Sequence, residues 1–110
     1  MELEVGDSVI VKTGVVDPDF GFDIGGWQGR VKEVDDDDMV FIAWDSVTLQ
    51  QMGLDLIIRC ENENLDWQVM TLWQTEVEKT MSRDSKKDVI SATSVLKLEI
   101  IDDPRFNAYQ

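Results

Sequence analysis

The 110-residue sequence predicts a small, mainly β domain, and three observations support that fold class. Short runs of β-branched and alternating apolar residues recur between turn residues, as in the strands of a half-buried sheet. Two of these runs flank four consecutive aspartates, an arrangement typical of a hairpin. A glycine-rich excursion, residues 13–26, separates the first run from the second and is too long for a tight turn.

The first half of the chain is expected to form three strands. The second and third make a hairpin, because the aspartate turn at 35–38 joins two apolar runs. Gly29 lies inside the second strand, where a glycine indicates a bulge or the close approach of another backbone. In the excursion Phe20, Phe22 and Ile24 alternate, so one of them is expected to fill the core. The three strands are expected at residues 7–12, 27–34 and 39–45.

The second half is expected to combine a short helix with further strands. Asp45 or Ser46 can cap this helix, because both side chains accept hydrogen bonds from N–H groups of a first helical turn. Gly53 is expected to end it, since glycine readily adopts the backbone conformation that follows a helix. The further strands are expected at residues 54–60 and 69–73 and around Val77.

The chain is expected to divide after residues 1–80, which contain the predicted domain. Residues 81–88 are charged and nearly free of apolar side chains, so they are expected to be a linker. The C-terminal extension, residues 89–110, is expected to add a strand at 89–101, and a helix through 89–96 fits nearly as well. A strand beyond a linker can pair with the sheet of a second copy, so a homodimer through this segment is a further expectation.

The order of these elements is similar to that of a small Src-homology-3-like (SH3-like) barrel. The chain also resembles a family of small bacterial proteins that are often labelled calcium-binding. The resemblance rests on the sequence motifs GGWQGR and WDS, within the pattern DPDF…IGGWQGR…WDS.TL. The resemblance covers residues 5–79 and implies an SH3-like barrel with one or two short helical turns. It says nothing about residues 81–110.

The charge of the chain restricts its partners. Acidic residues number 23 and basic residues 10, which gives a formal net charge of −13. Nucleic acid is excluded as an expected partner, because phosphate binding needs a cationic surface. An acidic surface attracts cations, amines and basic proteins, and it repels anionic membranes.

Two residue counts restrict the chemistry. The chain has no histidine and one cysteine, Cys60, so Ser-His-Asp and Cys-His catalysis, an intrachain disulfide and a Cys/His zinc site are all excluded. Cys60 is expected to be a small buried apolar residue. The first residues lack the apolar run of a signal peptide, and no stretch is long enough for a membrane helix. A non-catalytic, cytoplasmic protein is therefore expected.

Aromatic residues near the excursion are the candidate partner-binding site. In SH3-like barrels the groove beside the long first loop is commonly aromatic and takes extended peptides or methylated amines. Trp44 and Trp73 lie inside apolar strands and are expected in the core instead. The expected partner-binding residues are Phe20, Phe22, Trp27 and Trp67.

Three aspartates of the excursion, Asp17, Asp19 and Asp23, are candidate metal ligands. Calcium takes several oxygens, including carboxylates, but no glutamate lies at the distance that an EF-hand loop requires. A shallow calcium site completed by backbone carbonyls is one interpretation. The other is turn chemistry, because aspartate side chains hydrogen-bond the backbone nearby and Pro18 presets its φ angle.

The sequence therefore predicts a non-catalytic acidic module that binds a basic protein, a basic peptide or a small cationic ligand. Binding of calcium is the alternative, and no other cofactor is expected.

Overall fold

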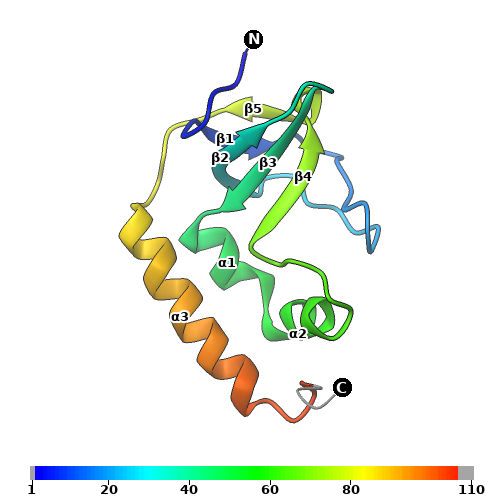
Figure 1. Cartoon of the computed structure of the whole chain (residues 1–110), viewed down its shortest axis with the longest axis vertical. Coiled ribbons are helices and arrows are strands. Elements are labelled where there is room, and N and C mark those ends of the chain that lie inside the picture. The colour runs from blue at the N-terminus through cyan, green and yellow to red at the C-terminus, as the bar shows by residue number, and fades with distance from the viewer. Residues whose placement is uncertain (1, 107–110) are drawn as a thin grey trace.

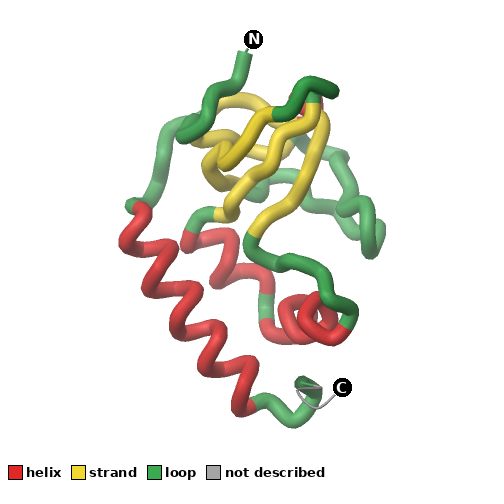
Figure 2. The backbone as a smooth tube through the Cα atoms, in the orientation of Figure 1, coloured by secondary structure: helices red, strands yellow, loops and turns green. Residues whose placement is uncertain are grey.

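The computed structural model describes residues 2–106, so the last four residues of the predicted extension, 107–110, lie outside the described part. Within that part, an antiparallel sheet of five strands is combined with three helices (Figure 1). The strands gather at one end of the molecule and the helices at the other (Figure 2). None of the helices described is long and apolar enough to cross a membrane.

The sheet confirms the strands expected in the first half and at 69–79. Its order is β4-β3-β2-β1-β5, and each pairing is antiparallel. Alternation places Val9 and Val11 on the buried face, as their spacing predicts. The strands are β1 (Ser8–Val11), β2 (Gln28–Val34), β3 (Met39–Trp44), β4 (Val69–Trp73) and β5 (Val77–Lys79).

The hairpin of β2 and β3 closes through the aspartate turn. The Asp35 carboxylate accepts hydrogen bonds from the N–H groups of Asp37 (2.9 Å) and Met39 (3.0 Å). Asp38 adopts a φ angle of 62°, a conformation that aspartate tolerates better than most residues. The run of aspartates therefore supplies the hydrogen bonds and the backbone freedom that this turn needs.

Gly29 marks a close approach of two backbones. A Cβ atom built at Gly29 would lie 2.4 Å from the carbonyl oxygen of Ala43 on the neighbouring strand. The register shift of the hairpin lies further along β2, between Val31 and Glu33. Of the two interpretations of this glycine, the close approach is therefore confirmed.

Three helices exceed the one or two short helical turns expected. Asp45 caps the first helix by accepting the N–H of Thr48 at 2.8 Å, and Gly53, with a φ angle of 80°, ends it as predicted. The strand expected at 54–60 is wrong: this short apolar run is part of the second helix, and a run of that length does not distinguish strand from helix. The helices are α1 (Ser46–Met52), α2 (Leu54–Asn62) and α3 (Lys86–Asp102).

The strand expected at 89–101 is also wrong, because α3 occupies that segment. Its buried residues, Ala92, Leu96 and Ile100, recur every four positions and pack against α1 and α2. A capping box in which Ser85 and Asp88 each accept the other's N–H begins the helix. A homodimer formed by exchange of a strand at 89–101 is therefore ruled out, because this segment is helical. A homodimer through the same segment by other contacts stays a prediction.

The core lies between the sheet and the helices. Ile24 is the residue of the excursion that fills it, and Trp44 is buried as expected. Trp73 was expected in the core as well, but 52% of it is exposed. The reason is that β4 is an edge strand that buries Leu72 on one face and turns Trp73 to the other.

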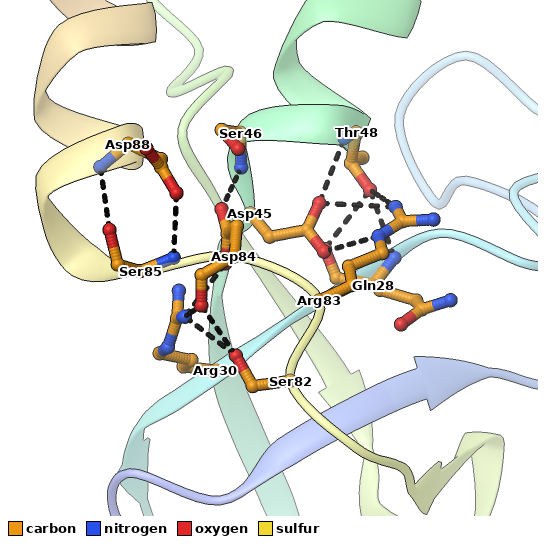
Figure 3. A network of polar contacts seen from close by, with 10 residues as sticks. All are labelled: Gln28, Arg30, Asp45, Ser46, Thr48, Ser82, Arg83, Asp84, Ser85 and Asp88. Carbon is orange, nitrogen blue, oxygen red and sulfur yellow. Dashed lines mark hydrogen bonds and ion pairs between the residues drawn. The ribbon is translucent and has the colours of Figure 1, made fainter.

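A network of polar side chains, buried around Asp45 and Thr48, attaches the segment before α3 to the rest of the fold (Figure 3). Arg83 donates two hydrogen bonds to the Asp45 carboxylate, from Nε to Oδ2 at 2.7 Å and from Nη2 to Oδ1 at 3.1 Å. Arg83 also donates to the Thr48 hydroxyl (3.0 Å), which in turn donates to the carbonyl of Gln28 (3.0 Å). This part of the network joins the segment to α1 and β2.

Asp84 is the second carboxylate of the network, and its side chain is 4% exposed. It accepts hydrogen bonds from Arg30 Nη2 and from the N–H of Ser46, both at 2.7 Å. Burial acts to raise the pKa of Asp84, but the hydrogen bonds from Ser46 and Arg30 outweigh it and lower the pKa below its ordinary value of 3.8. The carboxylate is thus held in its charged form.

Replacement of Gly29 by alanine is expected to lower the free energy of unfolding by about 3 kcal/mol, because the new methyl group overlaps the Ala43 carbonyl. Gly14 is the control: its φ angle is 88° and a Cβ there meets nothing within 4 Å. Gly14→Ala therefore adds only backbone strain, about 1 kcal/mol. Urea denaturation measures both variants, and equal losses would contradict the close approach at Gly29.

Asp84→Asn is expected to lower the free energy of unfolding by about 3 kcal/mol at neutral pH, because Arg30 then loses its buried counter-charge. The pKa of Asp84 is lower in the folded state, so its contribution is present above about pH 4 and is lost as the pH falls through the folded-state pKa. The difference between the variant and the parent should therefore shrink in acid. Asp102→Asn, at an exposed position, makes the same change of charge. If both variants lose the same stability in urea denaturation at pH 7, the role of Asp84 is refuted.

Candidate binding groove

A groove of about 350 Å³ opens between the excursion and the first two helices. In Figure 1 the excursion projects from the sheet on the side of α2. We call this site the excursion groove. Its lining combines two aromatic rings, two apolar helix residues, one amide and one group of each charge: Phe22, Trp27, Met52, Leu56, Gln51, Asp55 and Arg59.

The aromatic side chains of the excursion form a continuous series from the surface to the core. The ring centroids of Phe20 and Phe22 are 6.5 Å apart, and those of Phe22 and Trp27 are 5.7 Å apart. Trp27 meets the buried Trp44 edge to face at 5.2 Å. The structure thus brings together three of the four aromatic residues that the sequence selects, and each of the three is half-buried.

Phe20 is not among the residues that line this groove, and Trp67, the fourth selected aromatic residue, does not line it either. Trp67 is 4% exposed and belongs to the core, where its Nε1 donates a hydrogen bond to Glu61 at 2.8 Å. It borders a separate cavity of about 20 Å³ beneath the excursion. Trp67 therefore supports the groove from below and offers no open ring face.

Arg59 places a positive charge on the aromatic surface. Its guanidinium carbon lies 4.0 Å from the ring centroid of Phe20, within the range of a cation–π contact. The same guanidinium pairs with Glu63 one helical turn later, at 3.1 Å. Arg59 is not among the residues that the sequence pattern selects, because 54–60 is predicted there as a strand. The spacing of Leu56 and Arg59, three positions apart in the sequence, is the signal that places them on one face of a helix.

Two of the three candidate metal ligands make hydrogen bonds within the excursion itself. Asp17 is 3% exposed, and its carboxylate accepts the N–H of Phe20. Asp23 accepts the N–H of Gly25 at 2.7 Å. Asp19 is exposed. These contacts are those of aspartate turn chemistry. Within residues 2–106, no group of three or more acidic, histidine or cysteine side chains is arranged to hold a metal, and the calcium site stays a prediction.

Cys60 lies beneath the excursion and is 7% exposed, as expected of a small buried apolar residue. Burial raises the pKa of its thiol to about 11, and the nearby charges of Asp17 and Asp19 act in the same direction. The thiol is therefore protonated at neutral pH and unreactive.

Comparison of the chain with protein-family models, curated proteins and solved structures gave no significant match.

Cys60 is expected to resist iodoacetamide at pH 8 in the folded protein and to react fully in urea. The reason is that the reactive thiolate is scarce at this pH when the pKa is about 11, and the side chain is buried. Mass spectrometry over time measures the modification. Modification of the folded protein at the rate of a free thiol would show that the cysteine is accessible.

Proposed function

We propose that this protein is a non-catalytic binding module of SH3-like fold that holds a basic protein or peptide, or a small cationic ligand, in the excursion groove. The observation that carries the proposal is the guanidinium of Arg59, 4.0 Å from the centroid of the Phe20 ring. Phe20 stacks on Phe22, which lines the groove. A side chain of this protein thus makes, next to the groove, the contact that a partner's arginine would make.

The fold supports the proposal through the place of the groove. The excursion follows β1 and borders the site, as the long first loop borders the aromatic groove of SH3-like domains. The edge-to-face contact between Trp27 and Trp44 anchors this border to the core. A groove attached in this way keeps its shape before the partner arrives, which lowers the entropic cost of binding.

The charges near the groove favour a cationic partner. Asp19 and Asp23 of the excursion are exposed, and Asp55 lines the groove. Asp55 is already paired with Arg105 from the segment after α3. Arg105 therefore pairs with a carboxylate of the groove, and Arg59, which lines the groove, contacts the ring of Phe20 next to it. A basic partner can make both kinds of contact.

The test is a titration with a decapeptide of alternating arginine and proline, followed by the amide shifts of the protein. Saturable shifts are expected at residues 20–27 and 52–59. Phe22→Ala should weaken binding about tenfold, because Phe22 supplies an aromatic wall of the groove. Phe22 is a better position than Trp27, whose truncation would also remove the contact with Trp44. Trp73→Ala is the control, since it removes an exposed ring that does not line the groove.

Arg59→Gln gives a second, opposite effect. Removal of this guanidinium frees the face of Phe20 and is expected to tighten binding of the peptide about threefold. The proposal fails if a glutamate-for-arginine peptide binds equally well, or if Phe22→Ala and Trp73→Ala are equivalent. Saturable shifts confined to residues 17–26 on addition of calcium chloride, with no response to the peptide, would support the calcium alternative instead.

A further inference from the structure

A second groove, of about 400 Å³, lies where the N-terminal segment, β2, β3 and the first turns of α3 meet. We call it the α3 groove. Its lining and that of the excursion groove share no described residue, although Trp44 of this lining contacts Trp27 of the other. The apolar part of its lining consists of Val5, Val31, Ala43, Trp44, Val89 and Ile90.

The charged residues of the α3 groove have the opposite sign to the chain as a whole. Arg30, Lys32 and Lys86 line it, and no acidic residue does so among the described residues. Acidic residues outnumber basic ones by 23 to 10 in the sequence, so a lining whose charged residues are all basic is not expected from the composition alone. The groove is thus a local cationic site on an acidic protein.

Two of these three cations are free to meet a ligand. Arg30 is paired with Asp84 at 2.7 Å. Lys32 and Lys86 are exposed, and within residues 2–106 neither forms an ion pair. Their ammonium groups can therefore bind an anion without first breaking a contact.

Two apolar residues of the α3 groove, Val5 and Ile90, are open to solvent, whereas Val31 and Trp44 at its base are buried. Val5 is 69% exposed and Ile90 is 67% exposed, although both are large apolar side chains. A ligand that covers them removes apolar surface from water, which favours binding. The groove therefore offers apolar contact and positive charge in the same place.

We propose that the α3 groove binds a small amphiphilic anion, a molecule with an apolar body and a single anionic head group. The apolar body covers Val5 and Ile90, and the head group lies against Lys32 and Lys86. The volume falls within the range of small-molecule sites, about 300 to 1,000 Å³. The net charge of −13 does not prevent this, because salt screens charges beyond about 8 Å and the head group contacts the lysines directly.

The experiment uses three probes in amide-shift titrations: octanoate, 1-octanol and acetate. Octanoate has both parts of the ligand, octanol lacks the charge, and acetate lacks the apolar body. Octanoate is expected to give saturable shifts at residues 5–6, 31–32 and 89–90, and to bind about tenfold more tightly than octanol. Acetate should give no saturable shifts there.

Matched double variants test the lysines. Lys32→Gln with Lys86→Gln is expected to weaken octanoate binding about tenfold and to leave octanol binding unchanged. Lys12→Gln with Lys97→Gln removes the same charge from exposed positions outside the groove and should have no effect on either probe.

Four results would overturn the proposal. The first two are equal binding of octanol and octanoate, and equal effects of the two double variants. The third is that octanoate shifts residues of the excursion groove and not those of the α3 groove. The fourth is that an acidic peptide binds the α3 groove and octanoate does not. Because the two grooves are lined by different residues, failure here leaves the peptide titration of the excursion groove unaffected.

Discussion

The pairing of two carboxylates, Asp45 and Asp84, with two arginines organises the junction on which the rest of the structure depends. Asp45 caps α1 and holds Arg83, while Asp84 bonds the start of the same helix and holds Arg30 on β2. The sheet, α1 and the beginning of α3 therefore meet at one set of charges (Figure 3). In a buried site such charges fix geometry strongly, because a misplaced partner leaves an uncompensated ion.

One side of each groove takes its position from this junction. α1 leads through Gly53 directly into α2, so the face that borders the excursion groove takes its position from the capped start of α1. On the other side, the start of α3 follows Asp84 and Ser85, which places Lys86 and Ile90 beside the sheet. The two candidate sites are thus chemically opposite, one aromatic with acidic neighbours and one apolar with basic neighbours, on a common scaffold.

The sequence predicts most of the sheet and little of the helical half. Strands with strict alternation, such as the one that contains Val9 and Val11, depend on local pattern alone. For residues 89–101 the sequence pattern favours a strand over the alternative helix through 89–96, because alternation near the end of α3 also fits a strand; the helix is what forms, and Ser85 and Asp88 form its capping box. The aromatic cluster of the excursion is local in sequence and was identified. The bond between Arg30 and Asp84 joins residues 54 positions apart, and no local pattern reveals such a pairing.

The register shift of the hairpin has a consequence for how such a protein can diversify. The ladder pairs Val31 with Ile42 and Glu33 with Phe41, so Lys32 is the inserted residue with no counterpart across the strands. A side chain at this position projects into the α3 groove while the flanking pairs maintain the hairpin. Exchange of this one exposed residue therefore changes the charge at the α3 groove and leaves both the strand pairing and the buried side chains as they are.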